Sequence, residues 1–129
     1  MLAVDTNIVV RYLTADHPEQ SAQARRLVTG ADIFVASTVL LETEWVLRSS
    51  YGFSATQIAG RLRAFAGLPG VTLEAPAAVA AALDWMVVGM DFADALHLAA
   101  AEQCETFVTF DHRLGRVARR VGAISVRVL

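Results

Sequence analysis

The residues most able to do chemistry in this 129-residue sequence are five acids: Asp5, Glu42, Asp91, Asp94 and Asp111. Asp5 and Asp111 each follow a short apolar run, which places both at the end of a predicted strand. Four or five carboxylates gathered at one edge would raise one another's pKa, and a bound divalent cation would relieve that repulsion. Carboxylate oxygens without His or Cys suit Mg²⁺ or Mn²⁺ rather than zinc. Such an ion activates water and stabilises phosphoryl charge, so the chemistry predicted is in-line hydrolysis of a phosphodiester.

Glu42 is the acid that helix capping does not explain. Ser37 or Thr38 is the expected N-cap of a helix that runs to about Ser50, and in it Glu42 lies one turn before Trp45 and Val46. We therefore expect Glu42 to project from an apolar, inward face. Glu44 lies about 200° around the same helix, so the two glutamates cannot share one site.

The four aspartates each have a structural explanation as well. Asp5, Asp91 and Asp111 are favourable N-cap residues, and Asp94 would complement the helix dipole in the first turn after Asp91. We expect the two roles to coexist, with Asp91 acting at least partly as a cap and Asp94 as a metal ligand.

The elements that must position these acids alternate between short strands and helices. Apolar runs predict strands at residues 1–4, 33–36, 106–110 and 125–129, with a possible one at 71–73. Helical patterns begin near residue 8 and then cover about 18–29, 38–50, 55–66, 76–88, 92–102 and 112–120. This alternation predicts a three-layer α/β/α domain with a central parallel sheet of four to five short strands. Ligands bind at the carboxyl ends of such strands, where Asp5 and Asp111 would lie.

The amino-acid composition limits the classes of protein to which this chain can belong. Hydrophobic residues make up 55% and charged residues 19% of the chain, which predicts one packed domain over residues 1–129. The single cysteine, Cys104, allows no internal disulfide, and no apolar run suits a membrane span or signal peptide, so we expect a cytoplasmic protein. A net charge of −2 gives no general attraction to nucleic acid, so RNA binding would need metal ions or a local basic patch.

Four segments, in order and at fitting spacing, resemble the signatures of PIN-domain ribonucleases of the VapC toxin type: Asp5-Thr-Asn7, Thr38–Leu47, Asp91–His97 and Thr109-Phe-Asp111. The resemblance implies a PIN-like fold over the whole chain. It also implies an acidic metal site formed by Asp5, Glu42, Asp94 and Asp111, with Asp91 as an accessory acid. Thr6, Asn7 and Thr109 would support that site.

The same resemblance implies a function: a Mg²⁺- or Mn²⁺-dependent endoribonuclease, the toxin of a toxin–antitoxin pair, usually dimeric and silenced by a cognate antitoxin. One alternative is a catalytically silent PIN-like scaffold that binds RNA or protein. Another is a metal-dependent phosphatase with Asp5 as nucleophile, although that class would want a second acid where this chain has Asn7, and a lysine, which the chain lacks.

Basic residues near the acids have two interpretations. Arg113, Arg116 and Arg120 share a side of the predicted last helix, which can be an ordinary solvated face. Alternatively, Arg113 and Arg116 follow Asp111 closely enough to hold an RNA phosphate beside the metal. His97, one turn after Asp94, could bond to an acid or to substrate, or be structural.

Overall fold

A computed structural model describes residues 1–129 and contains seven helices and five short strands. The elements follow the order β1 (Leu2–Ala3), α1 (Thr6–Leu13), α2 (Pro18–Gly30), β2 (Ile33–Val35), α3 (Ser37–Ser49), α4 (Ala55–Ala66), β3 (Val71–Leu73), α5 (Pro76–Val87), α6 (Phe92–Ala100), β4 (Phe107–Thr109), α7 (His112–Val121) and β5 (Val126–Val128). The predicted α/β class is confirmed. None of the helices combines the length and the apolar character that crossing a membrane requires.

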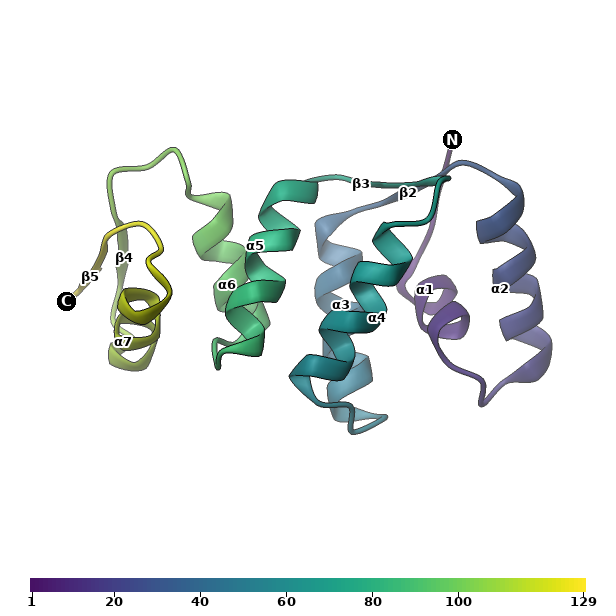
Figure 1. The fold of residues 1–129 in the computed structure, drawn as a ribbon, viewed down its shortest axis with the longest axis horizontal. Coiled ribbons are helices and arrows are strands. Elements are labelled where there is room, and N and C mark those ends of the chain that lie inside the picture. The colour runs from purple at the N-terminus through teal and green to yellow at the C-terminus, as the bar shows by residue number, and fades with distance from the viewer. The chain divides into compact units, whose positions relative to one another are not determined.

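The chain forms two compact units, Met1–Pro76 (unit 1) and Ala77–Leu129 (unit 2). In Figure 1, unit 1 runs from purple to teal and contains β1 to β3 with α1 to α4. Unit 2 runs from green to yellow and contains α5 to α7 with β4 and β5. Each unit therefore has helices and parallel strands of its own.

All strand pairs are parallel, as predicted. Unit 1 holds a three-stranded sheet in the order β1-β2-β3, in which Ile33 of β2 pairs with Leu2 on one side and Val71 on the other. Unit 2 holds the pair β4-β5, with Phe107 opposite Val126. The five expected strands therefore all form, in sheets of three and two strands.

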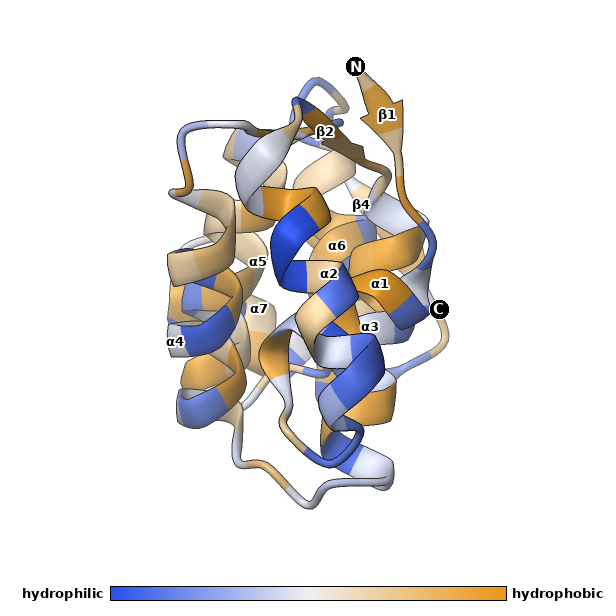
Figure 2. Ribbon diagram, turned by 90° about the vertical axis from the view of Figure 1, so that its right-hand side faces the viewer, coloured by the Kyte–Doolittle hydropathy of each residue, from blue (hydrophilic) through white to orange (hydrophobic).

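Helices of unit 1 bury one apolar side each. α1 packs against α2 and α3, and α3 packs against α4. In Figure 2, α1 is largely orange, whereas α2 carries blue, hydrophilic segments toward the viewer. The ring of Tyr12 meets Phe65 of α4 edge to face at 5.4 Å between centroids. Fully buried side chains of this core include Val9, Ile33, Val35, Leu40, Leu47, Ile58, Leu62 and Phe65.

The start of α3 differs from the prediction that Ser37 or Thr38 is its N-cap. The cap position is Ala36, which offers no side-chain bond, and the helix already begins at Ser37. Glu74, next to β3, supplies the missing acceptor: its Oε1 accepts a hydrogen bond from the Ser37 N–H at 2.9 Å. A carboxylate from a distant segment therefore satisfies the helix terminus, which no local capping rule reveals.

In unit 2, α7 packs closely on β5. Gly115 makes this possible, because a Cβ added there would lie only 2.7 Å from Cγ2 of Val128. Buried side chains of the unit include Val79, Leu83, Met86, Phe92, Leu98, Leu114, Val117 and Ala118. α7 ends at Gly122, whose φ of 69° is the left-handed conformation that glycine adopts most readily.

Candidate active site

Asp5 lies just past β1 and begins α1. Its Oδ1 accepts a hydrogen bond from the Thr6 N–H at 2.7 Å, and its side chain is otherwise exposed. The predicted position after the first strand and the capping role are both confirmed. Because only one oxygen is engaged in this bond, the carboxylate keeps capacity to bind a further partner.

Thr6 carries an unusual feature beside that acid. The residue is 6% exposed, and its Oγ1 is buried without a hydrogen-bond partner. A buried hydroxyl left unpaired costs free energy, so native proteins rarely keep one without a water, ion or ligand to satisfy it. Asn7, the next residue, is exposed. Thr6 and Asn7 therefore add neutral oxygen donors close to Asp5 in sequence.

Glu42 does not face inward as the sequence predicted. The buried side of α3 carries Leu40, Thr43, Glu44 and Leu47, whereas Glu42 is exposed. Trp45, one turn after Glu42, is 57% exposed, so it does not mark the core face.

Glu44 can be buried because Arg48, one turn later, neutralises it. Arg48 Nε donates to Glu44 Oε2 at 2.8 Å, and the Glu44 side chain is 3% exposed. The inward acid is thus the structural one, and Glu42 is the acid of α3 that is free to meet a ligand from solvent.

The N-terminus of α6 joins two acids of unit 2. Asp91 is the N-cap and its Oδ1 accepts a hydrogen bond from the Asp94 N–H at 3.2 Å. The capping role predicted for Asp91 is confirmed, and so is the place of Asp94 in the first helical turn.

Asp111 begins α7 in the same way. Its Oδ1 accepts a hydrogen bond from the Leu114 N–H at 3.1 Å. The Thr109 Oγ1 in turn accepts one from the Asp111 N–H at 3.0 Å, so Thr109 fixes the backbone from which Asp111 projects. The structure gives Thr109 a supporting contact to this acid.

Asp94 shows how close these charges are. Partial burial raises its pKa above the ordinary value, and the nearby charges of Asp91 and Asp111 raise it further, whereas His97 lowers it. The structure therefore brings Asp91, Asp94 and Asp111 together in unit 2, with His97 on the same helix as Asp94. Asp5 and Glu42 belong to unit 1.

The donor set is chemically suited to a hard divalent cation. All five acids offer carboxylate oxygens, and a cation would offset both the burial and the neighbouring charges that raise the pKa of Asp94. No group of three or more His, Cys, Asp or Glu side chains is assembled closely enough to hold a metal ion by itself. The acids thus fit Mg²⁺ or Mn²⁺ by chemistry, and three of them, Asp5, Asp91 and Asp111, have the geometry of capping residues.

Exposed arginines follow Asp111 on α7, namely Arg113, Arg116, Arg119 and Arg120. Arg113, Arg116 and Arg120 line one hollow with Gly89 and Val117. The shared side predicted for these three arginines is confirmed. Trp85 of α5 and Arg120 line a second hollow, which sequence reasoning missed because the two residues lie on elements that are distant in the chain.

Comparison with known proteins identifies the family of the chain. No curated protein matches it. The family model described as PIN domain matches residues 2–120, which covers nearly the whole chain and includes all five acids. With its parallel strands and its acids at strand and helix ends, the chain belongs to the PIN domain family.

Proposed function

We propose that this protein is a metal-dependent endoribonuclease that acts as the toxin of a VapC-type toxin–antitoxin pair. Membership in the PIN family indicates a nuclease-type function, since PIN domains are generally nucleases that use Mg²⁺ or Mn²⁺. The proposal adds the substrate, RNA, and the toxin role, for which the support is the set of four sequence segments that resemble such toxins.

The acids take the following roles in this proposal. Asp5, Glu42, Asp94 and Asp111 would hold the ion, with Asp91 as an accessory acid. Thr6, Asn7 and Thr109 would support them. Mg²⁺ or Mn²⁺, when bound, supplies charge neutralisation at the phosphate and lowers the pKa of a water.

The chain's own groups perform the remaining work. The N–H groups at the starts of α1, α6 and α7 hold the carboxylates of Asp5, Asp91 and Asp111 in fixed orientations. Arg113 and Arg116 would bind a phosphate of the RNA and orient it toward these acids.

The observation that carries the proposal is the placement of Asp91, Asp94 and Asp111 at the starts of α6 and α7, where their charges act on one another. Asp91 and Asp111 stay close to Asp94 even though their charges oppose its ionisation. Capping accounts for Asp91 and Asp111 singly, and the helix dipole for Asp94, but neither requires this crowding. A site that binds a divalent cation and a phosphodiester does need it.

Partners follow from the same proposal. We propose a homodimer in the cytoplasm, one folded domain over residues 1–129, and a cognate antitoxin protein that silences the enzyme. Exposed apolar side chains such as Trp45 of α3, at 57% exposure, give such partners a surface to cover. Light scattering of the purified chain tests the dimer directly, and a monomer at all concentrations would contradict it.

The deciding experiment is cleavage of total cellular RNA by the purified protein, freed of copurifying proteins, in Mg²⁺, Mn²⁺ or EDTA, with the cut ends mapped. Products should appear with either metal and disappear with EDTA. Asp5→Asn and Asp94→Asn should abolish cleavage, whereas Asp32→Asn, which changes an exposed aspartate of unit 1 outside the site, should not.

Two alternatives give different results in that experiment. A silent PIN-like scaffold would bind RNA without any metal-dependent product. A metal-dependent phosphatase that uses Asp5 would release phosphate from a small phosphomonoester and leave RNA intact.

A further inference from the structure

Two neighbouring hollows on unit 2 share Arg120. The first has a volume of about 470 Å³ and is lined by Asp84, Trp85, Val88, Arg120 and Val121. The second, of about 390 Å³, is lined by Gly89, Arg113, Arg116, Val117 and Arg120. Both volumes lie in the range of small-molecule sites. The end of α5, the turn after it and one side of α7 therefore form one surface with an aromatic half and a cationic half.

The cationic half consists of charges without partners. Arg113, Arg116 and Arg120 lie on one side of α7, all are exposed, and none forms an ion pair in the structure. At 1.5 Å per residue they extend over roughly 10 Å of helix, long enough to reach both phosphates that flank one nucleotide of an extended single strand. Three unpaired guanidinium groups in a protein of net charge −2 form a local site for phosphate rather than a general attraction to polyanions.

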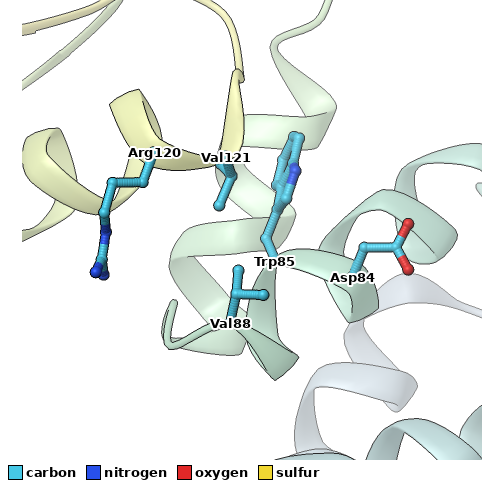
Figure 3. A pocket seen from close by; sticks show the side chains of 5 residues that line it. All are labelled: Asp84, Trp85, Val88, Arg120 and Val121. Carbon is cyan, nitrogen blue, oxygen red and sulfur yellow. The ribbon is translucent and has the colours of Figure 1, made fainter.

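The aromatic half offers a place for a flat group. Figure 3 shows Trp85 of α5 and Val88 just after the end of α5, with Val121 near the indole and the Arg120 side chain extending away from it. An indole stacks with any nucleobase, since every base has a π-face. Valine side chains beside the ring would exclude water from the edges of a stacked base.

We propose that the two hollows bind one unpaired nucleotide of single-stranded RNA, with its base on Trp85 and its flanking phosphates on Arg113, Arg116 and Arg120. This inference rests on the proposed function for the identity of the ligand. An acidic peptide would engage the arginines but leave the indole unused, and a base inside an RNA duplex cannot reach it.

The position of the subsite gives it a role in substrate choice. Arg113 lies two residues after Asp111, and Gly89 lies two residues before Asp91. A strand bound here therefore leads toward the starts of α6 and α7, where Asp91, Asp94 and Asp111 gather. The subsite selects an RNA that is unpaired next to the cut.

The two tryptophans of the chain allow a direct test. Trp45→Phe leaves Trp85 as the only tryptophan, and Trp85→Phe leaves Trp45. With EDTA present to prevent cleavage, a short unstructured RNA should quench the fluorescence of the first variant saturably and leave that of the second unchanged. Quenching of Trp45 alone, or equal quenching by polyglutamate, would overturn the proposal.

The arginines give an independent measurement with a matched control. Arg120→Gln should weaken binding of this RNA and lower the slope of log affinity against log salt by about 0.7, the value for one phosphate contact on a single strand. Arg119→Gln removes the same charge from a residue that lines neither hollow and should change neither quantity. Equal effects of the two variants would contradict the subsite. Trp85→Ala should weaken binding about 5- to 100-fold.

Failure of this inference and failure of the proposed function give different results. If Trp85→Ala and Arg120→Gln fold normally and cut RNA with unchanged kcat/KM, the subsite is wrong and the nuclease stands. If RNA quenches Trp85 but no metal-dependent product forms, the subsite stands and the protein is a scaffold.

Discussion

Asp94 carries a negative charge that its surroundings oppose. Its pKa is raised by partial burial first and by Asp91 and Asp111 second. Between the unfolded value of 3.8 and the higher folded pKa, the folded state holds a proton that the unfolded state has lost. The free energy of unfolding therefore falls as pH rises through this window. At neutral pH the ionised Asp94 destabilises the fold.

Asp94→Asn should therefore raise the Tm at neutral pH while it abolishes cleavage. The gain should be a few degrees at most, since 1 kcal/mol corresponds to about 4 °C in a chain of this size. Thermal unfolding across pH checks this. The difference between the variant and the unaltered protein should be largest near neutrality and vanish below the unfolded pKa, and a variant that loses stability at neutral pH would contradict the electrostatic account.

Glu42 and Glu44 make a matched pair on one helix, because one is exposed and the other is buried against Arg48. Glu42→Gln should reduce cleavage about 100- to 1000-fold, as expected for a lost electrostatic group, with stability unchanged to about 0.5 kcal/mol. Glu44→Gln should cost roughly 1–2 kcal/mol of stability, because it removes the charge-assisted bonds with Arg48, and leave cleavage intact. Activity assays and denaturant unfolding of both variants distinguish the roles, and the reverse pattern would assign the site to Glu44.

At the scale of elements, the approach of α7 to β5 depends on Gly115. A Cβ there would meet the branched side chain of Val128 at 2.7 Å, so Gly115→Ala should cost roughly 1–3 kcal/mol. A Cβ at Gly60 in α4 would have no atom within 4 Å, so Gly60→Ala should stabilise by about 0.5–1 kcal/mol. Denaturant unfolding checks both values. Combining Gly115→Ala with Val128→Ala should recover part of the loss if the clash is its cause.

The elements also explain which parts of the site the sequence could predict. Asp5, Asp91 and Asp111 each follow from a local rule, because a cap is recognised from its neighbours along the chain. The orientation of Glu42 could not be predicted from the sequence, because the apolar residues of α3 fit two helix faces. One face carries Trp45 and Val46, and the other, which is buried, carries Leu40 and Leu47. Glu44 lies among the buried residues of α3, whereas Arg48, which neutralises it, is exposed. The apolar pattern therefore gave no sign that Glu44 would be buried.

Contacts between distant segments were beyond sequence reasoning altogether. The Glu74 carboxylate at the start of α3 and the shared hollow of Trp85 and Arg120 both join residues that no periodicity connects. The unpartnered hydroxyl of Thr6 is a similar case, because burial decides whether a threonine needs a partner.

At the scale of the whole molecule, the proposed ion links stability to metal. A ligand that binds only the folded state stabilises it by about 2.7 kcal/mol at 100 times its Kd. Mg²⁺ should therefore raise the Tm, and a monovalent salt at equal ionic strength should not. Because the proposal assigns metal binding to Asp5 and Asp94, Asp5→Asn and Asp94→Asn should each reduce this Mg²⁺-dependent shift, whereas Asp32→Asn should preserve it.

Calorimetry on the full chain separates this proposal from its alternatives without any RNA. One folded domain in which Asp5 and Asp94 both take part in binding Mg²⁺ should unfold in a single transition that moves upward with Mg²⁺. Two transitions, of which only one responds to Mg²⁺, would mean that the units unfold independently. A shift that survives Asp5→Asn but not Asp94→Asn would restrict Mg²⁺ binding to the aspartates of unit 2. In that case Asp5 would be a helix cap and nothing more.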